Sequence, residues 1–152
     1  MNKHRHHYLS FGLMAQGIEL LGACLDDGDF EQPGRSSARF ALAIRELFVS
    51  QNPLYGRYNN PREDPSLYAG LRCAQTHTMR PGKRVAYTHR TESVTERTTH
   101  LKQKGQKLIL VCEDLYDDFK VACEDIIGRI QRNELTGDKF RHPFLTITKF
   151  NQ

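Results

Sequence analysis

The chain has 152 residues, the length of one ordinary domain, and at this size it can bury roughly 68–70% of the surface that its unfolded form exposes. With 38% hydrophobic residues, 26% charged residues and a formal net charge of +4, it has too many aromatic and branched residues for a disordered protein. Four cysteines without a Cys-x-x-Cys pair indicate neither a zinc knuckle nor a disulfide framework, and no apolar run approaches the roughly 20 residues of a membrane span. We therefore expect one cytoplasmic domain over residues 1–152, with no membrane segment, no cofactor and no metal.

The first half of the chain predicts two amphipathic helices. Apolar residues recur at three- and four-residue intervals over 8–25, and the acidic stretch "DDGD" ends the run. The predicted core side of this helix is Leu9, Leu13, Leu20, Leu21, Cys24 and Leu25. The second helix follows a loop and is capped by Ser36 or Ser37. Its predicted core side is Phe40, Ala41, Ile44, Leu47 and Phe48.

A connector rich in Pro, Gly and Asn, residues 50–64, precedes a third predicted helix from about Pro65 to about Thr78. Asp64 is its expected N-cap and Pro65 its first-turn residue. The predicted core side of this third helix is Leu67, Leu71, Ala74 and Thr78.

Beyond residue 80 the apolar period changes from helical to nearly two. The stretches "RVAYTHR" and "QKLILVC" are short and rich in branched or aromatic residues, which predicts an extended excursion or β-hairpin. A fourth helix is predicted over "EDLYDDFKVACEDIIGRIQRNE", with acidic first turns and an apolar side made of Leu115, Phe119, Ala122, Ile126 and Ile130. The tail suggests an extended segment carrying Phe144, Leu145, Ile147 and Phe150. The expected fold is mainly α, a bundle of four main helices with the excursion between the third and fourth.

Charge is distributed unevenly in the second half of the chain. Residues 80–107 hold eight Lys or Arg against two Glu, whereas residues 108–135 hold seven Asp or Glu against three Lys or Arg. The basic stretch could contact a phosphate backbone, or it could pair with the acidic start of the fourth helix in the same molecule. Under the first reading the nucleic-acid-binding residues are Arg80, Lys83, Arg84, Lys102, Lys104 and Lys107.

The sharpest candidate site is Arg72 and His77 near the end of the third helix. On a straight helix, residues five apart lie about 140° around the axis and about 7.5 Å along it. One phosphate could meet both if the arginine wraps round, if the helix loosens, or if the two residues come from different subunits across a twofold axis. The pair suits RNA cleavage, because histidine can accept a proton from a 2′-hydroxyl while a guanidinium holds the phosphate.

The residues "LYAGLRCAQTH", followed at a distance by "QKLILVCEDLYDDFKVAC", resemble a bacterial branch of the HEPN superfamily of helical bundles. In active members of that family an arginine, four to six residues and a histidine form a metal-independent ribonuclease site across a homodimer. The resemblance implies that Arg72 binds phosphate and stabilises the transition state, and that His77 is the general base or acid. It implies RNA and a second copy as partners. The position after the arginine, usually polar in active members, is Cys73 here.

Three alternatives stay open at this point. The chain could be a catalytically inactive HEPN-like interaction or regulatory module with an unidentified protein partner. Arg84 and His89 match the same spacing within a stretch that is predicted to be extended. Cys73 and His77, four residues apart on one helix side, could form a thiolate and imidazole pair as in nucleophilic hydrolases, although a cysteine in a bundle helix more often packs in the core.

Overall fold

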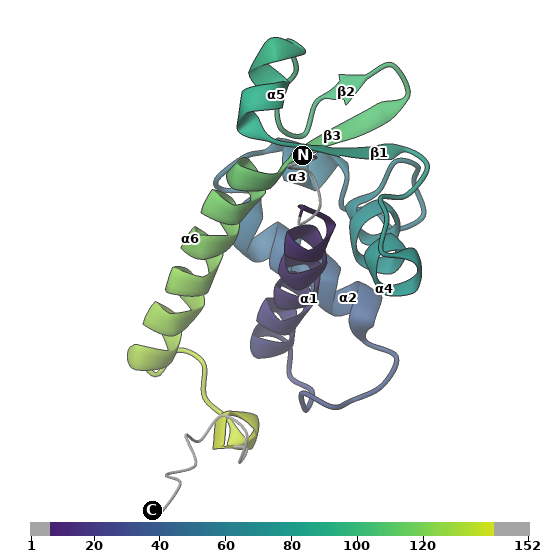
Figure 1. The fold of residues 1–152 in the computed structure, drawn as a ribbon. Helices are drawn as coiled ribbons and strands as arrows, with labels where there is room; N and C mark the ends of the chain where they lie inside the picture. The colour runs from purple at the N-terminus through teal and green to yellow at the C-terminus, as the bar shows by residue number, and fades with distance from the viewer. Residues whose placement is uncertain (1–6, 142–152) are drawn as a thin grey trace, which may run out of the picture.

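The computed structural model describes residues 7–141 and shows a mainly helical protein with a small three-stranded sheet at one end of the helices (Figure 1). The predicted extended tail with Phe144, Leu145, Ile147 and Phe150 lies outside the described residues. The described elements are, in chain order, α1 (His7–Leu25), α2 (Ser36–Ala43), the π-helix η1 (Ile44–Phe48), α3 (Leu54–Arg57), the π-helix η2 (Tyr68–Cys73), α4 (Ala74–Thr78), β1 (Val85–Thr88), α5 (Arg90–Thr95), β2 (Gln103–Lys104), β3 (Lys107–Val111), α6 (Cys112–Gln131) and the 3-10 helix η3 (Asp138–Arg141).

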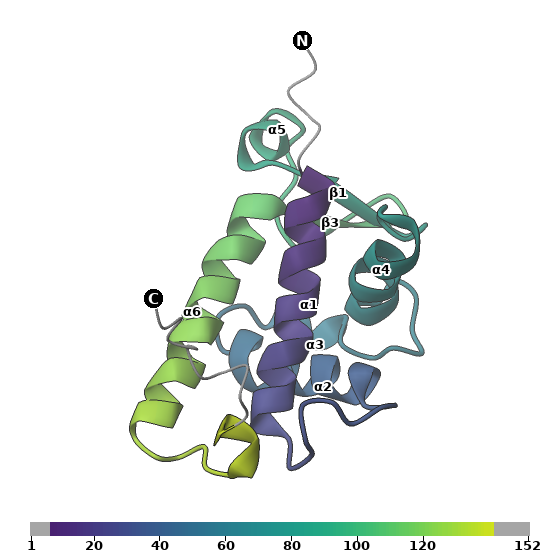
Figure 2. The same ribbon diagram turned by 60° about the horizontal axis from the view of Figure 1, so that its bottom comes forward.

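Helix α1 is the central helix, with α6 on one side, α4 on the other and α2 behind (Figure 2). Its predicted boundaries are confirmed, but half of its predicted core side is wrong. Leu21 is buried and Cys24 and Leu25 pack against the core as predicted. Phe11, Ala15 and Ile18 are fully buried, whereas Leu9, Leu13 and Leu20 are exposed. The helix has apolar residues on two sides, so periodicity alone could not decide which side meets the core.

The length and composition of Tyr8–Leu25 would also suffice for a membrane span, contrary to our expectation from the sequence that no stretch qualifies. Core helices of soluble proteins and signal sequences meet the same requirement. In the described fold this helix packs on α2 and α6 through its fully buried side.

The acidic stretch after α1 ends the helix as predicted, and buried cations hold it in place. Asp26 accepts a 2.7 Å bond from Arg39 Nε, and the Arg39 guanidinium also donates to the carbonyls of Asp29 and Phe30. Burial is the largest influence on Asp26 and opposes its ionisation, but the bond and charge of Arg39, the Gly28 N–H and the charge of Lys139 together outweigh it and lower the pKa of this carboxyl. Lys139 Nζ donates to the carbonyl of Ala23 at 2.8 Å, so it caps the last turn of α1.

The second and fourth predicted helices are confirmed as α2 with η1 and as α6. Four of the five residues predicted for the core side of the second helix are buried, namely Phe40, Ile44, Leu47 and Phe48. On α6 the stripe is buried at Leu115, Ala122 and Ile126, while Ile130, near the end of the helix, is 38% exposed. Both helices have one clear apolar side, and this side faces α1 and the rest of the core.

The predicted extended excursion forms a sheet of order β1-β3-β2, in which β1 pairs parallel to β3 and β2 pairs antiparallel to it. The hairpin is therefore β2–β3, turning at Gly105, whose φ of 61° suits glycine. Parallel strands need a crossover, and here α5 lies between β1 and β3 in the chain. The apolar run Leu108–Val111 is buried throughout because β3 is the central strand.

The connector over residues 50–64 is more ordered than predicted. It contains α3, whose Tyr55 is fully buried, and Tyr58 follows it into the core. The residues Pro, Gly and Asn indicated turns correctly. They did not show that two tyrosines in between are buried, or that the hydroxyl of Tyr55 has polar partners in His100 and Asp118.

Candidate functional site

The third predicted helix consists of η2 followed by α4, and it begins slightly later than expected. Asp64 and Pro65 are joined by a cis peptide bond, and Ser66 is the capping residue, since its Oγ accepts the Ala69 N–H at 3.1 Å. Met79, with φ of 54°, ends the helix in the left-handed region. On the predicted core side Leu67 and Leu71 are buried, but Thr78 is exposed and Gln75 is buried instead.

Arg72 lies in η2 and is held by a polar network between three helices. Its Nε donates to Glu19 Oε2 on α1 at 2.5 Å, and its Nη1 donates to Thr76 Oγ1 at 2.7 Å. The same Glu19 oxygen accepts a 2.8 Å bond from Ser36 Oγ at the start of α2. Gln16 Nε2 donates to Thr76 Oγ1 at 2.9 Å. The guanidinium is therefore fixed along its Nε edge and at Nη1, while the described residues provide no partner for Nη2.

His77 has different surroundings, because it lies on the last turn of α4 and is exposed. Arg72 is only partly exposed and faces α1 through Glu19. Among residues 7–141 the two side chains make no direct bond with each other. One chain thus supplies an oriented arginine and an accessible imidazole, but it does not join them.

The second match to the same spacing, Arg84 and His89, flanks β1. Arg84 Nε lies 3.4 Å from Asp64 Oδ2, and His89 Nδ1 lies 2.9 Å from Glu113 Oε1 at the start of α6. Each is thus engaged by a carboxylate from a different part of the fold. The pair lies at opposite ends of a strand, which separates it from the helical context of Arg72 and His77.

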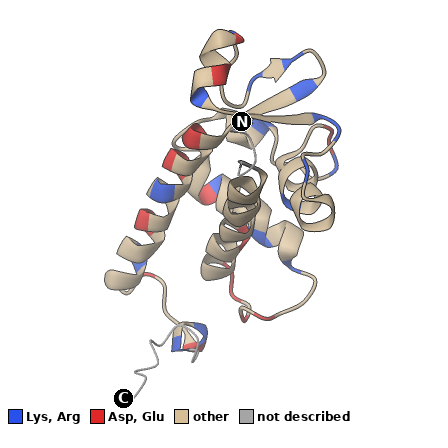
Figure 3. Ribbon diagram, in the orientation of Figure 1, with Lys and Arg blue, Asp and Glu red and all other residues tan. Residues whose placement is uncertain are grey.

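The structure has features that agree with each interpretation of the basic stretch, namely pairing with the acidic start of α6 and exposure to a phosphate backbone. Arg90 binds Asp114 at 2.5 Å and Asp117 at 2.9 Å, so one arginine of the basic stretch does pair with the acidic first turns of α6. Figure 3 shows these acidic turns in red near the start of α5. Lys104 pairs with Glu96 within the stretch at 3.1 Å. The residues predicted to bind nucleic acid are all exposed: Arg80, Lys83, Arg84, Lys102, Lys104 and Lys107.

These basic residues, called the basic band below, lie in the loop before β1 and on or next to the neighbouring strands β3 and β2. The N–H of Leu108 donates to the carbonyl of Arg84 at 2.8 Å, so Arg84 lies beside Lys107 across the paired strands. Arg80 and Lys83 lie in the loop that joins the end of α4 to β1. The band therefore begins next to His77 and continues onto the hairpin.

Sequence reasoning missed a buried polar chain made of His100, Tyr55 and Asp118. The Val111 N–H donates to His100 Nδ1 at 3.0 Å, so Nδ1 is the unprotonated nitrogen and Nε2 carries the hydrogen. Nε2 lies 2.9 Å from the Tyr55 hydroxyl, which donates to Asp118 Oδ2 at 2.7 Å. Burial lowers the pKa of His100 to about 4. It raises the pKa of Asp118, an effect to which Asp114 and Asp117 add.

His100 and Asp118 of this polar chain line a pocket of about 440 Å³ together with Asp114, Asp117 and Lys102. Every hydrogen-bonding position of His100 is used within the protein, which indicates a structural role for this residue. No group of three or more His, Cys, Asp or Glu side chains that could hold a metal ion occurs within the described range.

The four cysteines are free thiols and partly buried. Burial raises the pKa of Cys24, Cys112 and Cys123, which makes these three poor nucleophiles. Cys73 is partly buried, and the exposed His77 shows no bond to it in the described part of the chain. The thiolate and imidazole alternative gains no support from this geometry.

The chain matches no protein-family model, no curated protein and no solved structure. Its candidate site is thus defined by its own residues: an arginine oriented by Glu19, an exposed histidine five residues later, and a basic band that starts beside them.

Proposed function

We propose that the protein is a HEPN-like, metal-independent endoribonuclease or RNA-binding protein whose site is assembled between two copies of the chain. The proposal includes the bundle of four main helices that the resemblance implies, formed by α1, α2 with η1, η2 with α4, and α6. The observation that carries it is the state of Arg72. Glu19 and Thr76 fix its guanidinium, and no residue between 7 and 141 takes the Nη2 hydrogens, which can bind a phosphate.

The proposed chemistry needs only the residues at hand. His77 takes the proton from a 2′-hydroxyl, and the 2′-oxygen attacks the adjacent phosphorus. The bond to the 5′-oxygen breaks, which leaves a 2′,3′-cyclic phosphate. The 5′-oxygen takes a proton from solvent, and the His77 imidazolium returns its proton to solvent. Arg72 holds the non-bridging oxygens, whose negative charge increases in the transition state.

The basic band supports RNA as the substrate. Arg80 and Lys83 follow His77 within six residues, and Arg84 and Lys107 continue the positive charge along the strands. Such a band contacts phosphates irrespective of sequence and makes binding dependent on salt concentration. It would hold a single strand against the end of α4.

The test is cleavage of a labelled single-stranded RNA in the presence of a chelator. His77→Ala should abolish cleavage and leave the melting temperature unchanged, since this side chain is exposed. Arg72→Ala should abolish cleavage and also weaken RNA binding, because arginine contacts the phosphate in the ground state too. Arg129→Ala is the matched control, since it also removes a guanidinium that is held by one carboxylate, Asp125, but on α6. Cleavage that survives His77→Ala unchanged would refute the catalytic assignment.

Mixing the two inactive variants tests whether the site is shared. If Arg72 of one copy works with His77 of the other, a heterodimer of the two variants contains one intact pair. Partial recovery of cleavage on mixing is then expected. No recovery would mean that each site draws the two residues from the same chain.

The second candidate is a catalytically inactive HEPN-like interaction or regulatory module, and the Glu19–Arg72 ion pair favours it as well. A carboxylate 2.5 Å from Nε compensates the charge that a phosphate would otherwise meet. Cys73 replaces the usual polar residue after the arginine. In this case the parent protein cleaves no RNA, and Arg72→Ala mainly lowers stability, by about 1–3 kcal/mol, because a partly buried interaction is broken. Cys73→Asn tests whether the polar residue restores cleavage.

A further inference from the structure

Helix α1 exposes a row of leucines, interrupted by Gln16 and called the stripe below, on the side that faces away from the core. Leu9, Leu13, Gln16 and Leu20 follow one another at intervals of four, three and four residues, so they lie on one side of the helix. The three leucines are 54%, 66% and 52% exposed. Isolated exposed leucines are ordinary, but a row of them along a central helix indicates a contact surface.

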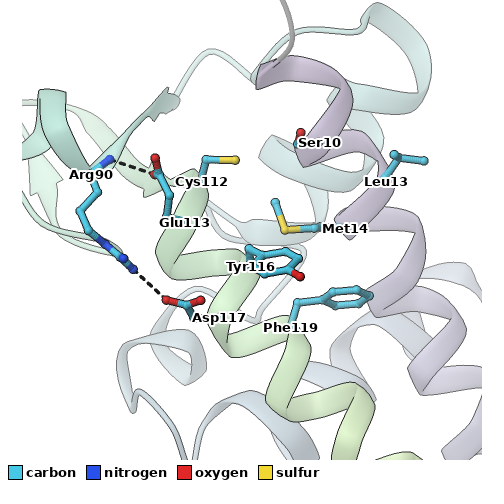
Figure 4. Close-up of a pocket in the computed structure, with 9 residues that line it drawn as sticks. All are labelled: Ser10, Leu13, Met14, Arg90, Cys112, Glu113, Tyr116, Asp117 and Phe119. Atoms are coloured by element: carbon cyan, nitrogen blue, oxygen red, sulfur yellow. Dashed lines mark hydrogen bonds and ion pairs between the residues drawn. The ribbon is translucent and has the colours of Figure 1, made fainter.

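The stripe borders a groove on its α6 side. Leu13 and Met14 of α1 and Tyr116 and Phe119 of α6 line a pocket of about 610 Å³. Figure 4 shows Met14, Tyr116 and Phe119 between the two helices, with Arg90 bound to carboxylates of α6 at one end. Tyr116 is 56% exposed, so it extends the apolar surface from α1 onto α6.

On its other side the stripe borders the candidate site. Gln16, at the middle of the stripe, donates to Thr76 Oγ1. Thr76 in turn accepts the bond from Arg72 and immediately precedes His77. Anything that covers the stripe therefore also lies beside the helix that carries Arg72 and His77.

The stripe is uncharged, which favours an apolar occupant with the same character. Glu19 is the single Asp, Glu, Lys or Arg between residues 8 and 25, and it is engaged by Arg72 and Ser36. With Tyr116, the exposed leucines offer on the order of 400 Å² of side-chain surface, about half of the ~800 Å² per partner of a standard interface, so polar residues around the stripe make up the rest.

We propose that this surface, α1 residues 9, 13, 16 and 20 with Tyr116 of α6, is the interface with a second copy of the chain, and that the two α1 helices pack antiparallel. Antiparallel pairing centred between Gln16 and Gly17 sets Leu13 opposite the partner's Leu20, and Leu20 opposite the partner's Leu13. The interface is then the same patch on both copies. Leu13 lies at the edge of the groove between α1 and α6, which a leucine of the partner can fill.

Antiparallel packing has a consequence that parallel packing lacks. Its twofold axis lies in the interface and runs perpendicular to α1, so a helix on one side of α1 stays on that side in the partner. Both α4 helices then lie along one edge of the dimer, whereas parallel packing would set each α4 against the partner's α6. That Arg72 and His77 of two copies share one surface rests on the proposed function, while the interface itself rests on the apolar surface.

The test is the oligomeric state of a substituted chain, measured by light scattering coupled to size exclusion. The parent should have twice the 17.5 kDa chain mass, and Leu13→Asp or Leu20→Asp should have the single mass with an unchanged melting temperature, because both leucines are exposed. Val94→Asp, at an exposed apolar position on α5, should remain a dimer. A parent that stays monomeric, or a dimer that persists in both leucine variants, overturns the proposal.

Two further measurements distinguish a dimer interface from a membrane-binding surface and from the ribonuclease site. A monomeric parent that floats with phosphatidylglycerol-containing vesicles, and loses this binding in Leu13→Asp, would assign the stripe to a membrane surface and overturn the proposal. A dimer that Leu13→Asp dissociates, in a parent that cleaves no RNA, would support the interface and refute the ribonuclease function.

Discussion

His100 should make the protein unusually sensitive to mild acid, and this prediction follows directly from its bonding. Its Nδ1 accepts the Val111 N–H and its Nε2 donates to Tyr55, so the neutral ring is fully bonded. Protonation would place a second hydrogen opposite the Val111 N–H and a charge in the core. The pKa of His100 is accordingly lowered from 6.5 to about 4.

The magnitude follows from linkage between protonation and folding. In the unfolded chain His100 binds a proton near pH 6.5, but in the folded chain it does so only near pH 4. The stabilisation is thus fully present above pH 6.5 and is lost as the pH falls toward 4. At about 1.4 kcal/mol per pKa unit, the loss between pH 7.5 and pH 4.5 is about 2.5 kcal/mol. The raised pKa of Asp118 acts in the opposite direction, because the folded state binds that proton more readily.

The comparison is with His100→Asn, whose amide oxygen can still accept the Val111 N–H but does not titrate. Urea unfolding of both proteins at pH 7.5 and pH 4.5 gives the free energy of unfolding in each case. The variant is expected to be less stable at pH 7.5, since the bond to Tyr55 is lost, and to lose about 2.5 kcal/mol less on acidification. Equal losses in both proteins would refute the assignment of the acid sensitivity to this histidine.

Three further predictions concern the packing and the basic band. Gly22→Ala should lower the stability of the protein by about 3 kcal/mol in thermal unfolding, because a Cβ there would lie 1.8 Å from the carbonyl oxygen of Arg39. Gly12→Ala is the control and should be tolerated, since a Cβ there would lie 3.4 Å from its nearest atom. Arg39→Met should lower the free energy of unfolding in urea by roughly 3–5 kcal/mol, since it leaves Asp26 buried without its main partner. Arg35→Met removes a longer and more exposed contact with the same carboxylate, so it should cost less than about 1 kcal/mol. If the band binds RNA, fluorescence anisotropy should show a shallower salt dependence of affinity when alanine replaces Lys102, Lys104 and Lys107. If the dependence of affinity on salt concentration is unchanged, the hairpin does not contact RNA.

Where a segment has one apolar side, the sequence predicted both the element and its burial. Phe40, Ile44 and Leu47 on the second helix, and Leu115 and Ile126 on the last, are buried as the three- and four-residue spacing indicated. The alternating and branched residues around β1 and β3 likewise identified strands. In these segments the side chains that the local pattern places on the apolar side are the ones that the tertiary packing buries.

The sequence could not resolve α1, because both of its sides are apolar. Leu9, Leu13 and Leu20 fit a helical period as well as Phe11 and Ile18 do. The tertiary structure buried the second set, in part because Phe11 stacks on Tyr87 of β1 at 3.9 Å between ring centroids. The choice depends on a contact between residues far apart in the chain, which periodicity cannot contain.

The pairing order of the strands could not be predicted for the same reason, because it too depends on contacts between residues far apart in the chain. The "KQKG" signal correctly indicated a turn, but only the fold shows that it joins β2 to β3 and that β1 pairs in parallel with β3 across α5. The cis peptide bond between Asp64 and Pro65 and the burial of Tyr55 could not be predicted either, because neither produces a periodic pattern in the sequence.

The sequence by itself determined a mainly helical single chain with a strand excursion, and it singled out Arg72 and His77 by spacing. Only the tertiary structure decided what surrounds them. Glu19, 53 residues earlier in the chain, orients Arg72, and His100 meets Tyr55 across 45 residues. Spacing along a helix records which residues share a side, but ion pairs and buried polar chains form between elements whose approach is set by the packing of the whole core.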